Sequence, residues 1–288
     1  MKYKYINAIR ANILIYTNKK SSNKLDGTYK SVYRGKSMNF ECLRDYTIDD
    51  EIKDIDWKAS AKYRSLLVKQ FVAEKKHNIL FVFDTGLKMS GNTELFDDKK
   101  MVAMMTAGTI GYLAINNGDY VGLIYNKQDK IVYHPYKNNL YYLEYFLTQI
   151  DKDCCLENKE GLNRALSYLS KNLKKRSILF IITDLHGLEN IDTKLLNSIN
   201  THNDVLLINI NDAYMHGDNL FDINNQSYIP KFVACNNHLE QVERKIRQEL
   251  YEQILTKIKI DIVSINGLKE INLKVIELLE RHRNASIN

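Results

Sequence analysis

Two hydrophobic patterns alternate along most of the chain. Short apolar runs, roughly four to eight residues long and typical of buried strands, are followed by longer segments in which apolar residues recur every three or four positions, as in helices. The predicted strands span 77–84, 120–125, 130–134, 177–183, 204–210 and 260–264. The predicted helices span 95–116, 140–150, 162–173, 191–200, 236–258 and 271–282.

This alternation predicts an α/β protein with a mostly parallel sheet and helices on both faces. The segment between strands 120–125 and 130–134 is too short for a crossover, so these strands are expected to form an antiparallel hairpin at one edge of the sheet. Residues 213–235 break the alternation and are expected to be an irregular insertion. Residues 1–76 lack it and are expected to be an N-terminal extension, packed on a domain that spans 77–288.

Composition indicates where in the cell the protein resides and which classes of partner it can bind. Within its 288 residues the chain has no apolar run of the roughly 18 residues that a bilayer crossing requires, and its amino terminus lacks a signal-peptide layout. The four cysteines show no metal-ligand spacing and are expected to be free thiols. We therefore predict a cytoplasmic protein. The net charge of +6 comes from dispersed lysines without a nucleic-acid-binding motif, so no nucleic-acid partner is expected.

Two predicted strands end on an aspartate, which is where open α/β sheets place their ligand sites. Asp84, followed by Thr85 and Gly86, ends the first strand, and Asp184 ends the strand at 177–183. An aspartic protease would need a second Asp-Thr/Ser-Gly triplet, and a phosphatase with an aspartate nucleophile would need an aspartate where Gly86 stands. No phosphate loop, nucleophile elbow or zinc-protease motif is present, so the sequence predicts a protein that is not an enzyme.

An ordered set of short motifs is similar to the signature of a bacterial protein family. The motifs are Arg34-Gly35, Phe40, Leu43-Arg44-Asp45-Tyr46, Asp49-Asp50, Ile55-Asp56-Trp57, Ser60-Ala61-Lys62, Asp84 through Met89, Gly118 through Leu123, and Ile182-Thr183-Asp184. On these residues the chain resembles the domain-of-unknown-function 58 family, whose members have a von Willebrand factor A-like core and accompany MoxR-type AAA+ ATPases. The resemblance implies that fold, a protein-binding adaptor role in the assembly or activation of other proteins, a MoxR-type ATPase partner and an unknown protein client.

The metal-ion-dependent adhesion site of the von Willebrand A fold uses the motif Asp-x-Ser-x-Ser and a later aspartate. At the matching positions this chain keeps Asp84 and Asp184, but Gly86 and Lys88 replace the two serines. Mg²⁺ requires hard oxygen ligands, and a lysine ammonium beside two carboxylates would compete with it. We therefore predict a degenerate metal site at Asp84 and Asp184, in which Lys88 replaces the cation, and no cofactor. The alternative is a ligand-binding domain that depends on a divalent cation, Mg²⁺.

The signature segment around Trp57, the only tryptophan, allows two interpretations. Its other members are polar: Arg44, Asp50, Asp56 and Ser60. In the structural interpretation, Trp57 packs the extension on the sheet domain while the aspartates cap turns or pair with basic neighbours. In the other, the segment binds a partner. The structural interpretation is favoured because tryptophan is highly buried on average, and the partner is then expected at the loops around Asp84, Asn92 and Asp184.

Overall fold

The structure, a computed structural model, divides into two compact units, a large one of Met1–Val32 with His77–Asn288 and a small one of Tyr33–Lys76. Residues 1–32, expected from the sequence to belong with the segment that forms the small unit, instead fall in the large unit. The residues described are 3–16, 19–33, 40–48, 50–71, 76–93, 95–128, 130–154, 161–211, 219–222, 227–230, 245–246, 249, 252 and 260–285.

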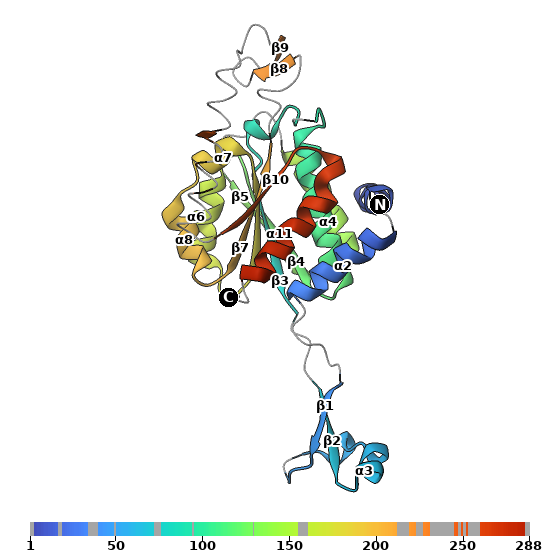
Figure 1. Cartoon of the computed structure of the whole chain (residues 1–288). Helices are drawn as coiled ribbons and strands as arrows, with labels where there is room; N and C mark the ends of the chain where they lie inside the picture. Colours follow the sequence, from blue (N-terminus) through green and yellow to red (C-terminus); the bar gives the residue numbers. More distant parts are fainter. Residues whose placement is uncertain are drawn as a thin grey trace. The chain divides into compact units, whose positions relative to one another are not determined.

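A six-stranded sheet forms the centre of the large unit (Figure 1). Its strands are β3 (Asn78–Phe83), β4 (Tyr120–Lys127), β5 (Lys130–Lys137), β6 (Ile178–Thr183), β7 (Asp204–Ile210) and β10 (Asp261–Ile265). They lie in the order β10-β7-β6-β3-β4-β5, and only the β4–β5 pair is antiparallel. This is the doubly wound order 3-2-1-4-5-6 when the six strands are numbered along the chain. The predicted mostly parallel sheet with one antiparallel edge strand is confirmed.

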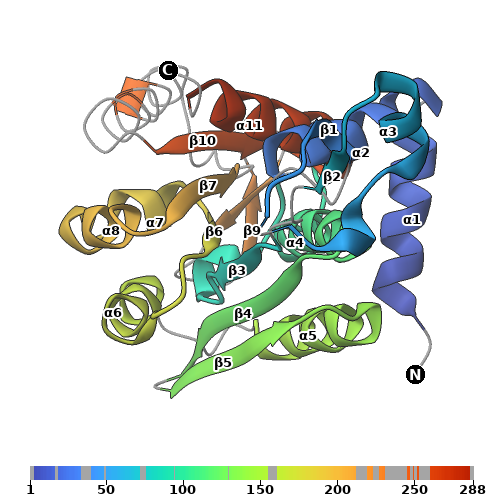
Figure 2. The same cartoon turned by 90° about the horizontal axis from the view of Figure 1, so that it is seen from below.

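Helices cover both faces of this sheet (Figure 2). One face carries α6 (Leu162–Asn172), α7 (Leu185–Glu189) and α8 (Thr193–Asn200). The other carries α4 (Lys99–Asn116), α5 (Leu140–Asp153) and α11 (Ile271–Ala285), with α1 (Lys4–Tyr16) and α2 (Lys19–Tyr33) outside them. Helix α4 begins at Lys99 rather than at residue 95 because Asp98 caps its first turn, accepting a hydrogen bond from the backbone N–H of Met101 at 2.6 Å.

The strands of the sheet are continuous apolar runs because they are buried on both faces. In β3, Leu80 and Val82 belong to the core cluster on the side of α6 and α8. Phe81 points the other way, with its ring centroid 6.3 Å from that of Phe146 on α5 and 5.8 Å from that of Phe180 on β6. A parallel sheet of this kind brings the carboxyl ends of β3, β6 and β7 to one edge.

Buried polar contacts attach helices α1 and α2 to the rest of the large unit. The carboxylate of Glu144, on α5, accepts hydrogen bonds from the backbone N–H groups of Tyr5 at 3.0 and 3.1 Å and of Ile6 at 2.8 Å. A carboxylate at a helix N-terminus is stabilised by the helix dipole. In α2, the hydroxyl of Tyr29 donates to Asp119 at 2.7 Å, and Asp119 also accepts from the backbone N–H of His77 at 2.8 Å.

The small unit pairs two strands with a short helix. Strand β1 (Phe40–Asp45) is antiparallel to β2 (Leu67–Phe71), and between them lie the 3-10 turn η1 (Ile52–Asp54) and helix α3 (Trp57–Tyr63). The reversal of the chain after α3 occurs at Arg64, which has a left-handed backbone with φ of 55°.

The region expected to be an irregular insertion contains an antiparallel pair, β8 (Asn219–Asp222) and β9 (Ser227–Pro230). The predicted helix over 236–258 lies largely outside the described residues. Among the helices that the structure describes, none combines the length and the apolar character that a membrane crossing requires.

Candidate functional site

Asp84 and Asp184 lie at the carboxyl ends of β3 and β6, which are adjacent parallel strands. A shared site at Asp84 and Asp184, as predicted from the sequence, requires this adjacency. The backbone N–H of Asp84 donates to the carbonyl of Ile182 at 3.0 Å, which ties the two strand ends together. Each aspartate is only 1% exposed, so neither carboxylate can itself contact a partner.

Each of these aspartates is paired with a buried lysine. Lys88 Nζ lies 3.0 Å from Asp84 Oδ2, and Lys99 Nζ lies 2.7 Å from Asp184 Oδ2. Lys88 belongs to the 3-10 turn η2 (Leu87–Met89), and its side chain is 4% exposed. Lys99 is the first residue of α4, with a side chain that is 1% exposed. We call these four residues the aspartate–lysine cluster.

Neighbouring groups complete the hydrogen bonding of Asp84. The hydroxyl of Thr183 donates to Oδ2 at 2.7 Å, and the backbone N–H of Gly86 donates to Oδ1 at 3.2 Å. The next residue, Thr85, donates its hydroxyl to the carbonyl of Asn126 on β4. Asp84 is therefore satisfied on both carboxylate oxygens, as a buried charge must be.

Asp184 is satisfied in the same way. Its Oδ1 accepts from the backbone N–H of Gly187 at 2.8 Å, which caps the first turn of α7. Lys99 Nζ, besides pairing with Oδ2, donates to the carbonyl of Lys88 at 2.6 Å. The two ion pairs are thus linked through the η2 turn into one buried network.

This donor set does not fit a divalent cation. Mg²⁺ demands near-octahedral oxygen ligands and keeps several waters, whereas an ammonium group lies against each carboxylate. Gly86 and Lys88 offer no hydroxyl where the fold would place one. Among the described residues no group of three or more His, Cys, Asp and Glu could hold a metal ion. The sequence predicts that Lys88 takes the place of the cation, and in the structure Lys88 pairs with Asp84.

Lys99 was missed by the sequence analysis, although the chain carries a signal for it. A cation in the first turn of a helix is unfavourable because the helix dipole is positive there. Helix α4 nevertheless starts with Lys99 and then presents a run of buried apolar residues. A lysine at this position in a buried helix requires a carboxylate partner, and Asp184 is that partner.

A separate set of contacts holds the signature segment of the small unit together. Arg44 Nη1 donates to Asp50 Oδ2 at 2.7 Å, and its Nη2 donates to Oδ1, so the pair is bidentate. Asp50 also accepts from the backbone N–H of Thr47 at 2.8 Å and from its hydroxyl at 2.9 Å. The hydrogen bond from Arg44, followed by that from the Thr47 backbone, holds the pKa of Asp50 well below its usual range.

Asp56 and Ser60 fix helix α3. Asp56 is its N-cap, with Oδ1 accepting from the backbone N–H groups of Lys58 at 3.1 Å and Ala59 at 3.0 Å. Ser60 is buried, and its hydroxyl accepts from the backbone N–H of Leu67 at 2.9 Å, which joins α3 to β2. The capping and pairing expected of these polar signature residues is what the structure contains.

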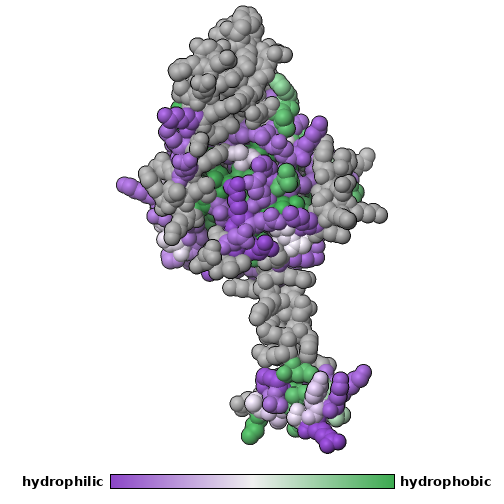
Figure 3. All heavy atoms as spheres, in the orientation of Figure 1, coloured by the Kyte–Doolittle hydropathy of each residue, from purple (hydrophilic) through white to green (hydrophobic). Residues whose placement is uncertain are grey.

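Within the small unit Trp57 is not buried. Its side chain is 63% exposed. Helix α3 is short and buries only Ser60, so its packing on β2 leaves the Trp57 side chain uncovered. Other large apolar side chains of the small unit are also exposed: Ile48, Ile52, Tyr63 and Leu66. Figure 3 shows apolar and hydrophilic residues intermixed on the visible face of this unit.

The doubly wound sheet with its antiparallel edge strand defines an open-sheet α/β protein, with two lysine-paired aspartates at the ends of adjacent strands. The chain belongs to the family described as protein of unknown function DUF58, whose family model matches residues 42–217. That match includes the small unit's signature segment and both aspartates. No curated protein matches the chain significantly.

Solved structures with similar folds have low sequence identity to this chain. BatB from Bacteroides thetaiotaomicron is 12% identical, with a TM-score of 0.49, over 72% of this chain and 99% of that one. An aerotolerance-related membrane protein from Bacteroides fragilis is 10% identical, with a TM-score of 0.44, over 71% and 99%. The von Willebrand A domain of SpRpn10 is 9% identical, with a TM-score of 0.40, over 72% and 95%. Similarities at this level concern the fold alone.

Proposed function

We propose that this protein is a non-enzymatic adaptor that binds other proteins, and that a MoxR-type AAA+ ATPase is its partner in the cytoplasm. The aspartate–lysine cluster carries the first part of the proposal. Open α/β sheets bind ligands at the carboxyl ends of their strands. In this protein two buried ion pairs fill that position, because Lys88 pairs with Asp84 and Lys99 pairs with Asp184.

The same cluster argues against the commonest catalytic roles. An aspartate nucleophile or general base must reach a substrate atom within hydrogen-bonding distance. Asp84 and Asp184 are 1% exposed and already accept hydrogen bonds on both oxygens. The ATPase partnership rests on the family membership and on the resemblance described above, and any ATP chemistry belongs to that partner.

The partnership is tested by binding to the purified MoxR-type ATPase of the same host. We expect the full chain to bind the ATPase, with the same affinity in EDTA and in Mg²⁺ when the ATPase is saturated with nucleotide beforehand. Because both carboxylates are buried and paired with lysines, we expect no cation bridge from Asp84 or Asp184. If the chain failed to bind the ATPase both in EDTA and in Mg²⁺, this proposal would be contradicted.

A divalent-cation-dependent ligand-binding domain is the alternative function. A ligand that binds only the native state raises the free energy of unfolding, by about 2.7 kcal/mol at a hundredfold excess over its dissociation constant. We expect Mg²⁺ to leave the denaturant midpoint of the parent protein unchanged relative to an equal ionic strength of NaCl. A saturable rise with Mg²⁺ that disappears in Asp84→Asn would favour the alternative.

A further inference from the structure

The exposed side of helix α3 combines an aromatic ring with unpaired positive charge. Residues four apart lie on the same side of a helix, so Trp57 lies above Ala61 and Lys58 lies above Lys62. These four residues form one continuous strip, which we call the Trp57 face, and all four are exposed. Ser60, the buried residue of α3, lies outside this strip and anchors the helix to β2.

The polar residues of the signature segment stabilise the small unit, whereas the Trp57 side chain has no comparable structural role within it. Arg44 and Asp50 pair with each other, Asp56 caps α3, and Ser60 joins α3 to β2. Trp57 is the largest side chain of the segment and remains 63% exposed. Such a tryptophan, held on a rigidly capped helix, has the character of a binding hot spot, a class in which tryptophan is enriched.

The charges beside Trp57 indicate the chemistry of its partner. Among the described residues, neither Lys58 nor Lys62 forms an ion pair with a carboxylate; Lys62 Nζ instead lies 5.5 Å from the centroid of the Tyr63 ring. Three nearby acidic side chains are engaged elsewhere: Asp50 pairs with Arg44, Glu51 pairs with Lys53, and Asp56 caps the backbone of α3. The Trp57 face itself therefore presents two lysines and no acidic side chain beside its apolar anchor.

We infer that the Trp57 face is a docking surface for an acidic segment of a protein partner, one with an apolar pocket or side chain that covers the indole. Complementary potentials steer such partners together and disfavour others. The inference rests on the proposed adaptor function and deepens it, because it names the surface and the partner's chemistry. Under that proposal, the acidic segment belongs to the ATPase or to its client.

The first experiment uses the intrinsic fluorescence of the full chain, in which Trp57 is the only tryptophan. We expect red emission and efficient quenching by iodide. At constant ionic strength, the ratio of iodide to caesium quenching should fall in the double variant Lys58→Glu, Lys62→Glu, because the anion is no longer attracted. Blue-shifted, unquenched emission would mean that the chain covers Trp57 itself. A blue shift that grows with protein concentration would mean that a second copy does so. Either result overturns the inference.

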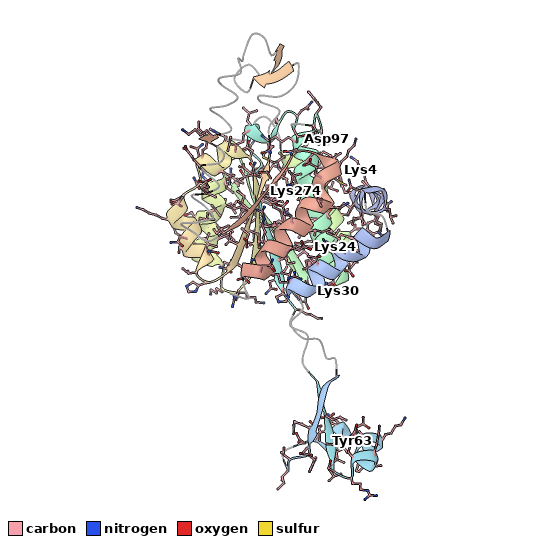
Figure 4. The ribbon with its side chains drawn as sticks, in the orientation of Figure 1. Lys4, Lys24, Lys30, Tyr63, Asp97 and Lys274 are labelled. Atoms are coloured by element: carbon pink, nitrogen blue, oxygen red, sulfur yellow. The ribbon has the colours of Figure 1, made fainter. Side chains whose placement is uncertain are left out.

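The second experiment measures binding of the full chain to synthetic acidic peptides that each contain one leucine or phenylalanine, with matched peptides in which Asn and Gln replace Asp and Glu. We expect the parent to bind only the acidic set. Trp57→Ala should weaken binding at least about thirtyfold, as expected for a hot-spot residue. Tyr63→Ala is the matched control, since Tyr63, which Figure 4 labels, is equally exposed at 63% but is not part of the Trp57 face. Both variants should keep the thermal midpoint of the parent.

The same variants, tested against the purified ATPase, separate this inference from the proposed function. If Trp57→Ala binds the ATPase and the peptides as the parent does, the docking surface is refuted and the adaptor function stands. If the parent binds acidic peptides through Trp57 but never binds the ATPase, the partnership falls and the surface stands. Tighter binding of a single-stranded oligonucleotide than of any acidic peptide would assign the face to nucleic acid and overturn the inference.

Discussion

Replacement of Lys99 by methionine is expected to lower the free energy of unfolding by about 3–5 kcal/mol, the cost of leaving one member of a buried ion pair without its partner. Lys99 Nζ lies 2.7 Å from Asp184 Oδ2, and both side chains are 1% exposed. Methionine retains most of the buried length of the side chain, so the loss reports on charge rather than on a cavity. Urea unfolding of the full chain measures the effect.

Two controls separate charge pairing from other consequences of the Lys99 substitution. The adjacent Lys100 pairs with Asp151 at 3.1 Å, but these side chains are 27% and 32% exposed, so Lys100→Met should cost only about 0–1 kcal/mol. The double variant Lys99→Met, Asp184→Asn should recover much of the loss, because no unpaired charge remains. Equal losses from Lys99→Met and Lys100→Met would contradict the buried network.

The sheet of the large unit was predictable because its hydrophobic pattern is unambiguous. Strands buried on both faces must be continuous apolar runs, and a short connection permits only a hairpin. The helices at 1–33 were not predicted, because their attachment depends on long-range polar contacts. The carboxylate that caps α1 is Glu144, far along the chain, and the partner of Tyr29 is Asp119. Local sequence carries no sign of such contacts.

The two aspartates of the candidate site were predictable because a topological rule applies to them. Asp84 and Asp184 end adjacent parallel strands, so their proximity followed from the alternation of strands and helices. The second lysine of the cluster comes from α4 and was not predicted, since its pairing depends on how that helix approaches the strand ends. The exposure of Trp57 within the small unit was not predicted, for a different reason. The average burial of tryptophan was applied to a residue on a short helix that buries only Ser60.

Substitution of Gly187 by alanine is expected to cost about 3 kcal/mol, at the upper end of the usual range for overpacking a buried site. A Cβ at this position would overlap Thr183 Oγ1 and would lie 3.1 Å from both Asp84 Oδ2 and Lys88 Nζ. Thr183 cannot move aside freely, because it is fully buried and its hydroxyl donates to Asp84. Alanine would therefore separate α7 from the aspartate–lysine cluster, and thermal unfolding measures the loss.

Gly27→Ala provides the matched control, because Gly27 lies in helix α2 and a Cβ there would meet nothing within 4 Å. Alanine is favoured over glycine in a helix by about 0.5–1 kcal/mol, so this variant should be slightly more stable than the parent. The double variant Thr183→Ala, Gly187→Ala removes the overlapping hydroxyl and should lose less stability than the sum of its single changes, since residues in contact are not additive. If Gly187→Ala were as stable as Gly27→Ala, the first turn of α7 would not pack on the cluster, and the strand ends would be open enough to admit a ligand.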